Sequence, residues 1–164
     1  MASNVKLRRY PNTFLAATLA VPLLLFSTSA HAAVGGSKEP KTSCRIEIDN
    51  AHFSTHFEER GLGKYVKVNA KSICNFNQRS VLLTVEIYKM ELFRNRLLNV
   101  YSTDPTSVKS NGKIIENNGA VVKCKNSRKT KYFGIAYAKA IINGKIQFAS
   151  RTRSEKITVL RCGT

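Results

Sequence analysis

Hydrophobic and polar residues alternate along much of the chain after residue 43, which is the pattern of a β-strand with one buried face. Over 44–49 the apolar residues occupy every second position, and charged residues occupy the positions between them. The same period of two returns over 66–74, after a polar connection at 58–63 that contains two glycines and predicts a turn. These segments predict the first two strands of the fold.

The strongest strand signal is the segment 81–90, VLLTVEIYKM, which is rich in β-branched and aromatic residues. We expect it at the centre of a sheet. A polar bend at 93–96 follows, and 97–101 predicts the returning strand of a hairpin. Turn signals then dominate 102–119, where the strand order is left open, and 120–123 predicts a further short strand.

The dipeptide Asn143-Gly144 separates two apolar segments, 132–142 and 145–150. Asn-Gly favours a type I′ turn, which needs a positive φ at both central residues, so a β-hairpin is predicted here. The segment 157–161 extends the last strand toward the C-terminus. About seven strands without a helical period predict an all-β fold, an immunoglobulin-like antiparallel two-sheet sandwich.

The first residues of the chain have a different pattern, typical of a secretory signal peptide. A basic start without acidic residues precedes an apolar run at 14–26, and a small-x-small pattern follows at 30–32. The run is shorter than the ~20 residues that span a bilayer. We therefore expect cleavage after residue 32 and a secreted chain with no membrane span, an uncleaved anchor being the alternative. The predicted segments are a signal peptide (1–32), a flexible lead-in (33–43) and a β-sandwich domain (44–164).

All four cysteines follow the predicted leader. An even number of cysteines in an exported chain predicts disulfides, because that compartment is oxidising. In an antiparallel hairpin, the mean of the residue numbers of two facing residues equals the residue number at the centre of the turn. The midpoint of the last two cysteines falls at 143, and that of the first two falls at 59, inside the 58–63 connection. The predicted disulfides are Cys44 with Cys74 and Cys124 with Cys162.

Several of these features together resemble a family of small secreted, disulfide-bonded β-sandwich proteins of actinobacteria. They are Cys44 opening an Ile-x-Ile-Asp-Asn strand, the segment 50–54 (NAHFS), the Asn-Gly hairpin and a terminal Arg-Cys. The resemblance covers 44–162. Many members carry Pro where this chain has Ala51, and they contain fewer lysines. The family's function is uncharacterised, so the resemblance implies the fold and the disulfides but no activity.

The chain is strongly basic, with 27 Lys and Arg residues, 10 Asp and Glu residues and a formal net charge of +17. Three of the cations lie in the predicted leader, so the predicted mature chain carries +14. This charge favours contact with polyanions such as nucleic acid, anionic lipid, teichoic-acid-like polymers or sulfated glycans. A solvated basic surface without a ligand is the alternative, because the cations are spread along the chain.

The densest group of cations is the segment 123–131, KCKNSRKTK, which two aromatic residues follow. By the midpoint rule, Arg151 and Arg153 face residues near 136 and 134, which brings them toward the same end of a sheet. Cations beside aromatic rings suit a polyanion through counterion release and stacking. We therefore expect an anionic polymer or a cell-surface component as the partner. The candidate polyanion-binding residues are Lys123, Lys125, Arg128, Lys129, Lys131, Arg151 and Arg153.

His52 and His56 are the only histidines after the predicted leader, and two glutamates follow them. A spacing of four residues directs two imidazoles at one metal ion only on a helix, and this segment predicts a turn. We expect His52 to form a hydrogen bond at the end of the sandwich, His56 to be exposed, and no metal site. No nucleophile is paired with a base in any recognisable motif, so we expect no cofactor and a non-enzymatic module. A small secreted effector or toxin-like enzyme is the alternative.

Overall fold

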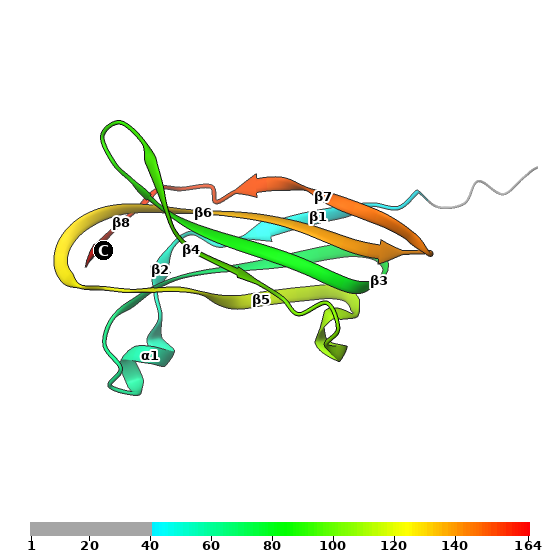
Figure 1. Cartoon of the computed structure of the whole chain (residues 1–164), viewed down its shortest axis with the longest axis horizontal. Coiled ribbons are helices and arrows are strands. Elements are labelled where there is room, and N and C mark those ends of the chain that lie inside the picture. Colours follow the sequence, from blue (N-terminus) through cyan, green and yellow to red (C-terminus); the bar gives the residue numbers. More distant parts are fainter. Residues whose placement is uncertain (1–40) are drawn as a thin grey trace, which may run out of the picture. The chain divides into compact units, whose positions relative to one another are not determined.

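The computed structural model describes residues 41–164, so the predicted signal peptide and most of the lead-in lie outside the described residues. Strands account for 69% of this part and helices for 6%, and the eight strands form one antiparallel sheet (Figure 1). The all-β prediction is confirmed. The strands are β1 (Cys44–Ile48), β2 (His52–Phe53), β3 (Tyr65–Met90), β4 (Asn95–Ser102), β5 (Gly112–Lys123), β6 (Asn126–Ile142), β7 (Lys145–Arg153) and β8 (Thr158–Gly163), and the helices are α1 (Thr55–Glu59) and η1 (Val108–Ser110).

Strand β3 organises the sheet, because its two halves pair with different strands. Its first half pairs with β1, β2 and β5, and its second half pairs with β4 and β6. The two strands predicted over 66–74 and 81–90 are therefore one continuous strand. Between them Ser80 has a φ of 49°, and the buried apolar residues change from even numbers over 66–74 to odd numbers over 81–87. One inserted residue produces this change, as in a β-bulge.

The predicted hairpin at Asn143-Gly144 is confirmed as the connection of β6 and β7. The two turn residues have φ angles of 50° and 74°, as the type I′ turn requires. The predicted last strand, 157–161, corresponds to β8, which pairs with the first half of β6 rather than extending β7. Strand β6 therefore has different neighbours at its two ends, β8 along its first half and β7 along its second half.

Both predicted disulfides are present. Cys44 lies directly opposite Cys74 in the β1–β3 register, with 4.2 Å between the two Cα atoms. The second bridge joins Cys124, which lies between β5 and β6, to Cys162 in β8, with 4.9 Å between the Cα atoms. The first bridge therefore holds β1 against β3, and the second holds the connection before β6 against β8.

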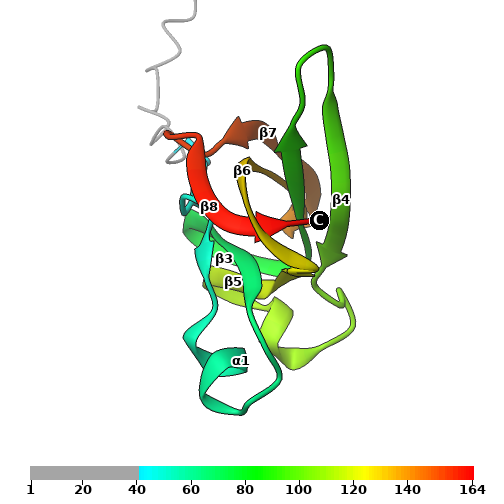
Figure 2. The same cartoon turned by 90° about the vertical axis from the view of Figure 1, so that its left-hand side faces the viewer.

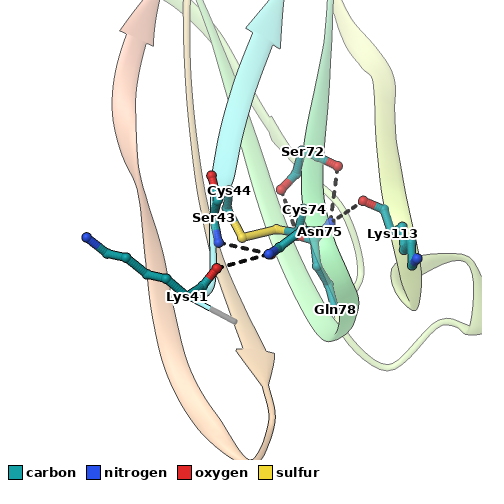
Figure 3. Close-up of a disulfide and its surroundings, with 8 residues drawn as sticks. All are labelled: Lys41, Ser43, Cys44, Ser72, Cys74, Asn75, Gln78 and Lys113. Atoms are coloured by element: carbon teal, nitrogen blue, oxygen red, sulfur yellow. Dashed lines mark hydrogen bonds between the residues drawn. A yellow bond between two sulfur atoms is a disulfide. The ribbon is translucent and has the colours of Figure 1, made fainter. Parts of the chain in front are cut away.

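Hydrogen bonds beside the first disulfide order the chain on both sides of it (Figure 3). The side chain of Asn75 donates to the carbonyl of Lys41 and accepts from the amide of Ser43. The buried amide of Gln78 donates to the carbonyls of Ser72 and Lys113, at 3.1 and 3.0 Å. Gln78 therefore connects β3 with β5 shortly before the bulge at Ser80.

The hydrophobic core draws its side chains from both halves of β3 and from β5 and β6. The buried phenol of Tyr132 donates to the carbonyl of Cys162, so this polar group is satisfied within the core. Within residues 41–164, no helix has the length and apolar character needed to cross a membrane. The largest completely buried apolar side chains are Tyr132, Leu83, Ile87, Ile115, Ile142, Val66, Val68, Val81 and Val85.

Candidate polyanion-binding surface

The predicted basic segment, 123–131, lies at one end of the sheet. It includes the last residue of β5, the disulfide-bonded Cys124 and the first residues of β6. The amide of Lys125 donates to the carbonyl of Gly163, and the Asn126 side chain accepts from the amide of Arg128. These backbone contacts order the segment without using its charged groups. All five of its cations are exposed, and none forms an ion pair with any residue of 41–164.

A sixth cation joins this end of the sheet. Arg161 of β8 lies directly opposite Lys129 of β6, and both residues are exposed. Two like charges on directly opposed residues destabilise a β-sheet. The sequence interpretation does not include Arg161, although the midpoint rule that pairs the last two cysteines also places it opposite residue 125, within the basic segment.

A groove of about 710 Å³ separates the basic segment from the hairpin formed by β3 and β4. On one side it is lined by Arg128, Lys129 and Lys131. On the other side it is lined by residues 89–92 of the hairpin. The register supports this arrangement, since Lys131 pairs with Met90 across β6 and β3. The sequence interpretation did not anticipate that this hairpin would contribute to the basic surface.

Arg153 is the last residue of β7. It is exposed, and it lies beside the middle of β6. It faces Ile135 rather than the predicted residue 134, because a register shift between Ala136 and Ala138 displaces the β6–β7 pairing by one position. Its guanidinium carbon lies 4.2 Å from the centre of the Phe133 ring, within range of a cation–π interaction. Arg153 therefore presents a positive charge held against an aromatic ring.

Arg151 differs from the other predicted residues because its charge has a partner. Its guanidinium donates to the carboxylate of Glu86, which is 7% exposed. The phenols of Tyr88 and Tyr137 also donate to this carboxylate, at 3.0 and 3.3 Å. Burial, followed by the bond to Glu86 and its negative charge, raises the pKa of Tyr88. We therefore define the basic surface as Lys123, Lys125, Arg128, Lys129, Lys131 and Arg161, with Arg153 beside it and Arg151 committed to Glu86.

The two histidines lie on different elements. His52 is on β2, and its Nδ1 atom is 2.9 Å from the carbonyl oxygen of Asn50. His56 is exposed and belongs to α1, a single helical turn in a segment for which the sequence predicts a turn without a helix. Since α1 begins at Thr55, the helix does not include both imidazoles. Over residues 41–164, no three His, Cys, Asp or Glu side chains are grouped to hold a metal ion.

The basic surface offers positive charge and hydrogen-bond donors, which are the groups that recognise phosphate, sulfate and carboxylate. Its cations come from three strands and one loop whose backbone is fixed by sheet pairing and a disulfide. The arrangement suits recognition of repeated anionic groups. Comparison of the chain with protein-family models, with curated proteins and with solved structures finds no match.

Proposed function

We propose that this protein is a secreted, non-enzymatic interaction module that binds anionic polymers of the cell envelope or of a host surface. In this proposal the leader at 1–32 directs export, and the strands on the two halves of β3 are the two sheets of an immunoglobulin-like sandwich. The observation that carries the proposal is the basic surface, six exposed cations at one end of the sheet that lack an acidic partner among residues 41–164.

The energetics of the basic surface favour an external anion. Lys129 and Arg161 repel each other across β6 and β8, because both are cations on directly opposed residues and neither has, among residues 41–164, a carboxylate beside it of the kind that Glu116 provides for Lys71, at 2.8 Å. A bound polyanion would neutralise the repulsion and release its own counterions into solution. Recognition of this kind depends on charge spacing and is indifferent to the sequence of the polymer.

Replacing Lys125, Arg128 and Lys129 by Gln tests the proposal. The control variant replaces Lys109, Lys113 and Lys145, which are equally exposed and without ion pairs to residues 41–164, but which lie toward the other ends of β5 and β6. Both variants remove the same charge. We expect the first to lose affinity for heparin and single-stranded DNA and the control to bind almost as the parent does. Equal losses would show that only net charge matters and would refute a defined surface.

A further inference from the structure

The hairpin of β3 and β4 extends away from the other strands in both views (Figures 1 and 2). Its turn is closed by a hydrogen bond from the amide of Glu91 to the carbonyl of Arg94, at 3.1 Å. The two central residues are Leu92 and Phe93, which are 95% and 98% exposed. No other large apolar side chains of residues 41–164 are as exposed as these two.

The composition of this turn is contrary to ordinary turn chemistry. Tight turns favour Gly, Asn, Asp, Ser and Pro, whose backbone and side chains suit the reversal of the chain. Leu92 and Phe93 have none of these properties, and their side chains contact almost nothing in the protein. Departures from local rules are expected at functional sites. Two adjacent, protruding apolar side chains are therefore best explained by a surface outside the protein that buries them.

Cations surround the apolar tip. Within the hairpin, Lys89, Arg94 and Arg96 share the single carboxylate of Glu91, at N–O distances of 3.7, 4.0 and 3.9 Å. Across the groove lie Arg128, Lys129 and Lys131. The hairpin and the facing segment therefore carry six cations and one anion near a tip that is itself uncharged.

We propose that the hairpin docks on an anionic lipid membrane, with Leu92 and Phe93 inserted among the acyl chains and the surrounding cations on the headgroups. An apolar tip bordered by cations matches the two layers of such a surface, and neither signal alone gives strong membrane binding. This inference rests on the proposed function, since it identifies lipid phosphate as one anion that the basic surface binds. A fluid bilayer fits a convex tip without requiring a complementary pocket.

The test uses the chain with the disulfides formed and vesicles of phosphatidylcholine with or without phosphatidylglycerol. The chain contains no tryptophan, so a Phe93→Trp variant places a single fluorescent reporter at the tip. We expect its emission to shift to the blue, and to be quenched by brominated acyl chains, only when phosphatidylglycerol is present. Binding without the shift would mean adsorption by charge alone and would overturn the inference.

The matched variants separate insertion from charge. Leu92→Ser with Phe93→Ser should weaken partitioning into anionic vesicles about ten-fold or more while heparin binding stays unchanged. The control, Ile146→Ser with Phe148→Ser, removes a pair on β7 that is 57% and 75% exposed and should change neither binding. If the protein binds heparin but not vesicles, the inference is overturned and the proposed function stays intact. The same holds if the Leu92 and Phe93 variant and the control variant weaken vesicle binding equally. Failure of both would reject the two together.

Discussion

The guanidinium of Arg151 on β7 donates a hydrogen bond to the carboxylate of Glu86 on β3, although these two strands do not pair with each other. Both strands pair with β6, so the ion pair crosses over the strand between them. Tyr137 of β6 lies beneath it, with its ring 5.4 Å from the guanidinium carbon. The contact thus connects three strands on one face of the sheet.

Arg151→Ala should destabilise the fold, because it leaves the nearly buried carboxylate of Glu86 with only two phenol donors. We expect the free energy of unfolding to fall by about 1–3 kcal/mol, less than for a completely buried pair because the Arg151 side chain is 54% exposed. Urea unfolding of the oxidised protein measures this change. Adding Glu86→Gln should recover much of the loss, and strictly additive losses would contradict the proposed contact.

The pKa of Tyr88 provides a second test of this cluster. Burial and Glu86 raise that pKa above the ordinary value of 10.0, so the folded state holds the phenol proton more tightly than the unfolded state. The resulting stability is present below about pH 10 and is lost as the pH rises through the folded-state pKa. Difference titration of phenolate absorbance against Tyr88→Phe should show the raised pKa. Glu86→Gln should lower it, and an unchanged value would exclude Glu86 as a cause.

Gly134→Ala should destabilise the core, because an added Cβ would lie 2.5 Å from Cγ1 of Val68 and 3.0 Å from Cδ1 of Ile48. Overpacking of this kind costs about 1–3 kcal/mol. Thermal or urea unfolding measures the loss. Combining the substitution with Val68→Ala should cost less than the sum of the two single changes, because the second removes the clashing methyl group. Additive costs would indicate that the clash is relieved by movement elsewhere.

Each disulfide should stabilise the fold to a similar extent, since the sequence separations of the bridged residues are 30 and 38. In the chain-entropy model, loops of this size contribute about 3–4 kcal/mol each. Replacing Cys44 and Cys74 together by Ala, or Cys124 and Cys162 together, should lower the free energy of unfolding by about this amount. A variant pair whose unfolding is unchanged would show that its bridge adds nothing to stability.

The sequence predicts the local structure well, because its signals depend on neighbouring residues. Alternation identifies the strands around the core, Asn143-Gly144 identifies the β6–β7 turn, and the midpoint rule identifies both disulfides. The rule works because an antiparallel hairpin fixes which residues face each other. It errs by one position at Arg153, because a register shift between β6 and β7 displaces the pairing.

Features that depend on distant strands were not predictable in the same way. Alternation cannot show that β3 continues through the bulge at Ser80, because the change of buried face resembles the start of a new strand. The contact between Glu86 and Arg151 joins strands that are not paired. The sequence predicts a polar bend at 93–96, which begins one residue after Leu92, because an apolar pair in a turn departs from the usual turn residues.

The most direct test of the proposed function is the salt dependence of polyanion binding. If about five cations of the basic surface neutralise phosphate groups of single-stranded DNA, the logarithm of the binding constant should fall with the logarithm of salt concentration at a slope of roughly −3.5. Titration of single-stranded DNA at several salt concentrations gives this slope. The Lys125, Arg128 and Lys129 to Gln variant should reduce its magnitude by about 2, and the Lys109, Lys113 and Lys145 variant should leave it unchanged. A slope that is the same in both variants would contradict a defined polyanion-binding surface.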